Sequence, residues 1–97
     1  MKIVWSELAV DRLNNIIDYI SEDNIQNAIS WAQGVFDNVD KLANFPEMGR
    51  ILPELNNDKI RELIHGNYRI IYKLESNFIS ILTIRNFKQI LPTDEVK

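Results

Sequence analysis

The sequence has no cysteine, and its 97 residues include only one histidine, three glycines and three prolines. Without cysteine there can be no disulfide, thiolate metal ligand or cysteine nucleophile. The single histidine, His65, cannot build a zinc site by itself. Three glycines are too few for the loops that cradle nucleotide phosphates. These absences exclude several catalytic chemistries, and we expect neither a cofactor nor a metal.

Long apolar runs are also missing, since none approaches the roughly 20 residues that a membrane helix requires. The first five residues lead directly into a polar helix start, unlike the basic and then apolar pattern of a secretion signal. A hydrophobic content of 45% and a charged content of 26% are ordinary for a folded domain. We therefore expect one compact cytoplasmic domain over residues 1–97, with no membrane partner.

Charge is unevenly distributed along the chain, which has a net charge of −3. Residues 1–49 hold eight acidic and three basic side chains, whereas residues 59–88 hold six basic and two acidic ones. The acidic total disfavours general nucleic-acid binding. A local basic surface could still bind phosphates or an acidic partner.

Two helices are predicted in the first half. Ser6 and Glu7 form a helix start, because a serine hydroxyl caps a free backbone N–H and a carboxylate favours the positive end of the helix dipole. Apolar residues at helical spacing continue to about Ser21. A second helix with one apolar stripe spans residues 25–43, and Gly34 within it would let the first helix pack closely. Only a short polar break separates the helices, so we expect an antiparallel hairpin.

The second half is predicted to be mainly β-structure, with a further short strand at the N-terminus. The expected strands cover residues 2–5, 60–65, 68–74 and 78–87. Gly66-Asn67 has the composition of a tight hairpin turn. Residues 51–58 are predicted to be an irregular connector, and residues 92–97 a frayed tail.

These elements predict an α+β fold with the order β-α-α-β-β-β, in which the helical hairpin packs on one face of a small antiparallel sheet. Side chains alternate between the faces of a strand. On the strand 68–74, Ile70 and Tyr72 therefore share one side, and Arg69 and Lys73 share the other. If the first pair faces the helices, the two cations point outward and form a basic working surface.

The candidate binding residues are the cations of this half and one aromatic neighbour: Arg50, Arg61, Arg69, Lys73, Arg85, Phe87 and Lys88. Arginine suits phosphodiester binding, because its planar fork donates to two oxygens and keeps its charge. Arg61 lies beside Glu62 and could instead form a structural ion pair.

Catalysis is harder to assign than binding. RNA cleavage without metal needs a base, a cation that stabilises the phosphorane, and an acid. Arg69 could be the cation, with Arg85 assisting, and Glu54 is a candidate base. Lys88 could be the acid only if its pKa were strongly lowered. These residues alone support a ligand-binding surface more than a catalytic one.

Several short segments spread over nearly the whole chain carry a family resemblance. They are Val4-Trp5-Ser6, Leu42-Ala43-Asn44-Phe45-Pro46-Glu47-Met48-Gly49-Arg50, Ile60-Arg61-Glu62-Leu63, Tyr68-Arg69-Ile70-Ile71-Tyr72, and Ile84-Arg85 leading to Lys88 and Leu91-Pro92. In this order and spacing the sequence resembles the RelE/ParE superfamily of toxins from bacterial type II toxin–antitoxin modules.

The resemblance implies a small toxin that is neutralised by a cognate antitoxin. RelE-like members cleave mRNA on the ribosome, and ParE-like members inhibit DNA gyrase. Arg69 falls where the nucleases place a transition-state arginine. Asn86-Phe87, however, stands where nucleolytic members often carry a histidine or tyrosine and where many ParE-like members read His-Gly.

The acidic composition and the loop from Phe45 to Arg50 are closer to the ParE-like branch. Gyrase inhibition is therefore the leading expectation. A ribosome-dependent mRNA endoribonuclease is the alternative. A non-toxic domain that binds an acidic or extended peptide is a further one.

Overall fold

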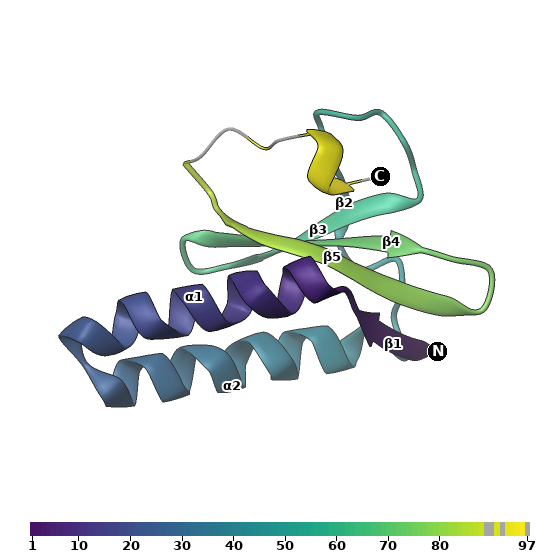
Figure 1. Ribbon diagram of the computed structural model, residues 1–97. Coiled ribbons are helices and arrows are strands. Elements are labelled where there is room, and N and C mark those ends of the chain that lie inside the picture. The colour runs from purple at the N-terminus through teal and green to yellow at the C-terminus, as the bar shows by residue number, and fades with distance from the viewer. Residues whose placement is uncertain (89–90, 92, 97) are drawn as a thin grey trace.

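The computed structural model describes residues 1–88, 91 and 93–96, and shows a helical hairpin packed against a five-stranded sheet (Figure 1). The elements are β1 (Lys2–Trp5), α1 (Glu7–Asp23), α2 (Ile25–Lys41), β2 (Arg50–Ile51), β3 (Ile60–His65), β4 (Tyr68–Leu74), β5 (Phe78–Asn86) and a short 3-10 helix, η1 (Thr93–Val96). The predicted α+β fold and its helical hairpin are confirmed.

The strand order is β1-β5-β4-β3-β2. The meander β3-β4-β5 is antiparallel as predicted, but β1 pairs parallel to β5, so the sheet is mixed. The two-residue strand β2 pairs with β3, and half of it lies in what was predicted to be an irregular connector. A strand of two residues has no measurable alternation of its own, so only its pairing partner identifies it.

The helix ends are set by side-chain caps. The Ser6 hydroxyl accepts a hydrogen bond from the Ala9 N–H at 3.0 Å, as its position predicts. Asn24 alone separates the helices: its backbone N–H donates to the Ile20 carbonyl, and its side chain accepts from the Asn27 N–H at 3.0 Å. The same residue thus ends α1 and begins α2, which makes the hairpin tight.

The main core lies between the hairpin and the sheet. Ile70 and Tyr72 of β4 are fully buried in it, as the alternation predicts. The apolar stripe of α2 is wider than the surface that this core covers, because Ile29 and Phe36 remain 46% and 44% exposed. Gly34 was predicted to let α1 pack closely, but the space beside it is filled by β3. A Cβ there would lie 2.6 Å from Cε1 of His65, so the glycine makes room for β3.

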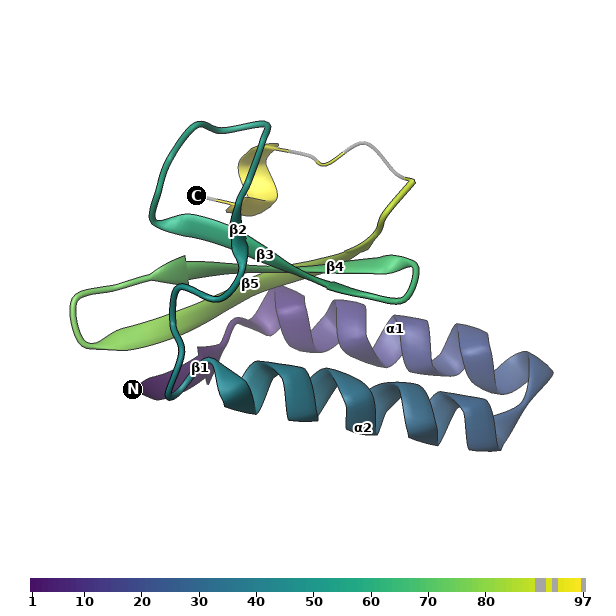
Figure 2. The same ribbon diagram turned by 180° about the vertical axis from the view of Figure 1, so that it is seen from behind.

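A second, smaller core covers the other face of the sheet. It consists of Leu52, Ile60, Ile71, Leu91 and Val96. In both views the connector after β2 and the helix η1 lie on the side of the sheet away from the hairpin (Figure 2). Residues 93–96 therefore form a 3-10 helix rather than a frayed tail, and Val96 is buried in this core, while Pro92 and Lys97 lie outside the described residues. The sheet face that was predicted to meet a ligand is largely covered.

Candidate functional site

Arg69, the residue on which the nuclease hypothesis depends, is the centre of a buried ion-pair cluster. Its side chain is only 7% exposed. Nε donates to the Glu62 carboxylate at 2.6 Å, and Nη1 and Nη2 donate to the two oxygens of Glu54 at 2.7 and 2.9 Å. Glu62 also accepts from Nε of Arg50. Arg69 does lie on the sheet face away from the hairpin, as predicted, but it is buried there and is not open to a ligand.

The strand register explains how this Arg69 cluster forms. Glu62 of β3 lies directly opposite Arg50 of β2 and Ile71 of β4. Arg69 is two residues from Ile71 on the same face, so it reaches Glu62 along the diagonal of the ladder. Glu54 comes from the connector that folds over this face. The sequence predicted the place of Glu62 in this strand, next to Arg61, but not its role at the centre of the cluster.

The charges of the Arg69 cluster balance, with two guanidinium and two carboxylate groups. The hydrogen bonds from Arg69 lower the pKa of Glu54, although partial burial opposes this shift. Hydrogen bonding to the carboxylate of Glu54, and to a smaller extent to that of Glu62, raises the pKa of Arg69 above its usual range. Glu54 is therefore a weak proton acceptor. It was the candidate base and Arg69 the candidate catalytic cation, but the two form an ion pair with each other.

Arg85 belongs to a second cluster, which was not predicted. Its Nη1 lies 3.5 Å from Oε2 of Glu95 in η1, and Arg12 of α1 donates to the same oxygen at 3.0 Å. The other oxygen of Glu95 accepts from the Thr83 hydroxyl at 2.9 Å. Arg12 and Glu95 lie in the acidic helix and in the presumed tail, so no local pattern connected them to β5.

The remaining predicted residues are separated. Arg61 does not pair with Glu62, but donates to the carbonyls of Asp58, Glu47 and Gly49 at 3.1, 3.2 and 3.0 Å. Lys73 forms an ion pair with Glu75, with 3.7 Å between Nζ and Oε1. Phe87 and Lys88 follow β5 with exposed side chains, Phe87 at 51%. The predicted continuous basic surface is therefore not formed.

The loop between α2 and β2 is held by hydrogen bonds to a buried side chain and presents apolar side chains to solvent. The Tyr72 hydroxyl accepts from the Gly49 N–H at 3.0 Å and donates to the Pro46 carbonyl at 2.8 Å. A Cβ at Gly49 would lie 2.6 Å from that hydroxyl oxygen. Phe45 and Met48 nevertheless remain 64% and 43% exposed. This exposed pair was not predicted as a binding feature, because hydrophobicity alone does not show which side of a loop is outside.

Among the residues that the structure describes, no three histidine, aspartate or glutamate side chains gather where they could hold a metal ion. Within the same residues, neither helix has the length and apolar character needed to cross a membrane.

Comparison with known proteins gives a consistent assignment. The family model described as "ParE toxin of type II toxin-antitoxin system, parDE" matches residues 3–91. The solved structure titled "Chromosomal ParDE TA system from P. aeruginosa" has the same fold, with a TM-score of 0.75. At 21% identity, the alignment covers 91% of this chain and 97% of that one. No curated protein matches the chain.

Proposed function

Because the chain belongs to the ParE toxin family of type II toxin–antitoxin systems, we propose that it inhibits DNA gyrase by binding, without cleaving RNA. It is the toxin component of such a module, and its partner is an antitoxin. Gyrase is the target that the resemblance to ParE-like toxins implies. Both partners would be met in the cytoplasm.

The observation that carries this proposal is the state of Arg69. A nuclease needs a cation that can contact the phosphorane as charge develops. Here the Arg69 guanidinium already makes three hydrogen bonds to two carboxylates and is almost fully buried. Freeing it would leave Glu62 with one partner in a dry site, which is costly. Binding activity needs no such rearrangement.

Among the predicted binding residues, we propose Phe87 and Lys88 as the contacts with gyrase. Both are exposed at the end of β5, and the exposed half of Phe87 offers apolar area next to a cation. Aromatic anchors of this kind often dominate interfaces. Arg61 and Arg69, in contrast, have structural partners inside the chain.

The antitoxin is proposed to bind the exposed stripe of α2. Ile25, Ile29 and Phe36 follow one another at helical spacing and are 65%, 46% and 44% exposed. Residues 7–41 around them hold seven carboxylates and two cationic side chains. An amphipathic antitoxin segment with basic flanks would complement both properties.

Two assays on the purified toxin test the mode of action. In a gyrase supercoiling assay, the toxin should inhibit the enzyme at micromolar concentration, and added antitoxin should restore activity. Phe87→Ala should weaken inhibition, whereas Lys2→Gln, an exposed change on β1, should not. In a translation extract, primer extension on mRNA should show no new ends. Discrete mRNA cuts together with unaffected supercoiling would refute the proposal.

A further inference from the structure

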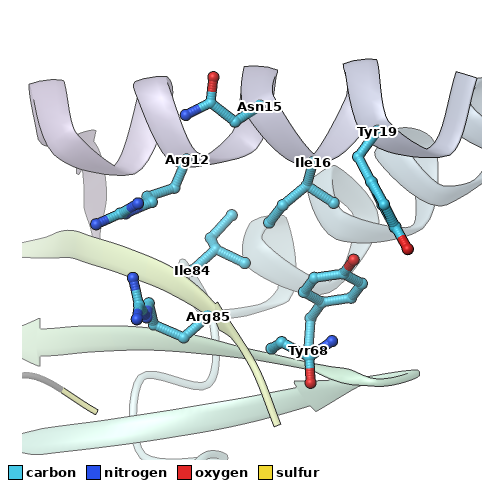
Figure 3. A pocket seen from close by; sticks show the side chains of 8 residues that line it. Arg12, Asn15, Ile16, Tyr19, Tyr68, Ile84 and Arg85 are labelled. Atoms are coloured by element: carbon cyan, nitrogen blue, oxygen red, sulfur yellow. The ribbon is translucent and has the colours of Figure 1, made fainter. Parts of the chain in front are cut away.

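A cleft of about 340 Å³ lies between α1 and the end of β5. Arg12 and Arg85 lie at one end of it, and Tyr19 and Tyr68 face each other at the other, with Ile16 and Ile84 between (Figure 3). The cleft exists because β1 pairs with β5 only as far as Ile81, so helix α1 rather than another strand lies beside the rest of β5.

The arginine end of the cleft has an excess of positive charge. In the described part of the chain, Arg12 and Arg85 share a single carboxylate, that of Glu95. The Nε atoms of both arginines are buried, and neither has a hydrogen-bond partner among the described residues. The side chains of Arg12 and Arg85 are only 33% and 16% exposed, so hydrogen bonds to water replace the missing partners only in part.

The Arg69 cluster on the same sheet shows what a completed arrangement looks like. There two guanidinium groups meet two carboxylates, and Arg69 is held by both oxygens of Glu54. Among the described residues no second carboxylate reaches Arg12 and Arg85, and the cluster adjoins a cleft instead of a covering loop. One more carboxylate would restore the balance.

We propose that this cleft binds an acidic peptide segment, with one carboxylate placed between Arg12 and Arg85. Arginine binds carboxylates in a planar, directional way. Tyr19 and Tyr68 would contact apolar groups of the neighbouring peptide residues, because each combines an apolar ring with a polar tip. The site is distinct from the proposed gyrase contact at Phe87, and it does not depend on gyrase being the target.

A peptide carboxylate fits better than a nucleic-acid backbone. Counted over the described residues, the charge excess is a single unit, whereas backbone binding relies on many cations that each meet a phosphate. The net charge of the chain is −3, which repels polyanions. The group that already occupies the two arginines is the carboxylate of Glu95, so the chain itself shows the chemistry that they accept.

The test uses ¹⁵N-labelled toxin and a capped pentapeptide with one glutamate between leucines. The Nε–H resonances of Arg12 and Arg85 should shift in a saturable way, and the same peptide with glutamine should bind about tenfold more weakly. Acetate and inorganic phosphate are titrated in parallel. Equal binding of the glutamine peptide, no saturable shift, or preference for phosphate would overturn the proposal.

Variants distinguish the cleft from general electrostatics. Arg85→Gln should abolish peptide binding, whereas Lys2→Gln, which removes an exposed cation elsewhere, should leave it unchanged. Glu95→Gln should strengthen binding, because it increases the uncompensated positive charge that the peptide carboxylate meets. If Arg85→Gln fails to fold, Glu95→Gln still decides, since unchanged or weaker binding would contradict binding through this charge excess. Supercoiling assays are not involved, so either proposal can fail alone.

Discussion

The substitution Glu62→Gln tests whether the Arg69 cluster supports the fold. Glu62 is fully buried and accepts from both Arg50 and Arg69. Glutamine has nearly the same shape but no charge: its amide oxygen can accept from one arginine, while its NH2 group would face the other. The change therefore removes the central charge and one of the two acceptor oxygens without creating a cavity. The loss of stability should come from electrostatics rather than from packing.

The expected cost follows from burial. Removing one partner of a buried ion pair costs about 3–5 kcal/mol, because the other charge stays in a dry site. Arg69 would keep its bidentate partner Glu54, which places the expected loss near the lower limit, about 3 kcal/mol. For a domain of this length, that corresponds to a fall of about 12–24 °C in Tm.

Urea denaturation followed by circular dichroism would measure the effect as a change in midpoint at constant slope. Two neighbouring variants provide a ranking. The Glu54 side chain is 38% exposed, so Glu54→Gln should cost about 1–2 kcal/mol. Arg50 is 57% exposed, so Arg50→Gln should cost at most about 1 kcal/mol. If Glu62→Gln costs no more than Arg50→Gln, the cluster does not hold the sheet as argued.

Three further outcomes are expected. Gly49→Ala should lower the unfolding free energy by about 2–3 kcal/mol in the same assay, because the new Cβ would lie 2.6 Å from the Tyr72 hydroxyl; a neutral result would contradict the tight packing of the loop. The folded pKa of Glu54 is lowered from 4.5, so its contribution is complete above that pH and disappears as the pH falls through the folded value; wild type should lose more stability below pH 4.5 than Glu54→Gln does. Ile29→Lys on α2 should weaken antitoxin binding in calorimetry at least about tenfold, whereas Ser30→Lys, an exposed change on another face of α2, should have little effect; equal losses would argue against the stripe as the docking surface.

The parts of the fold that could be predicted from the sequence are those with a local physical signal. Ser6 before an acidic first turn predicted the start of α1, and the alternation along residues 68–74 predicted that Ile70 and Tyr72 face the helices. Gly66-Asn67 predicted the hairpin, and Gly66 does adopt a φ of +59° there. Each of these predictions depends on neighbours within a few residues, where periodicity and capping act.

The second core could not be predicted in this way. Leu52 and Ile60 lie at the two ends of a connector without periodicity, and Val96 follows a proline in a polar tail. These residues meet Ile71 only because the chain returns twice to the same face of the sheet. That return also brings Glu54 to Arg69 and Glu95 to Arg85. The burial of both arginines is a property of the tertiary structure.

The pairing of Arg69 with Arg85 explains why these carboxylates are needed. The two residues are directly opposite across β4 and β5, and like charges in such a position are destabilising. Glu54 and Glu62 offset the first charge from one side, and Glu95 offsets the second from the other. A free catalytic arginine at position 69 would therefore have to exist next to a second cation without its counter-charges. Because the fold neutralises Arg69 in this way, the surfaces that we propose for partner recognition are the α2 stripe, the end of β5 and the cleft that Arg85 shares with Arg12.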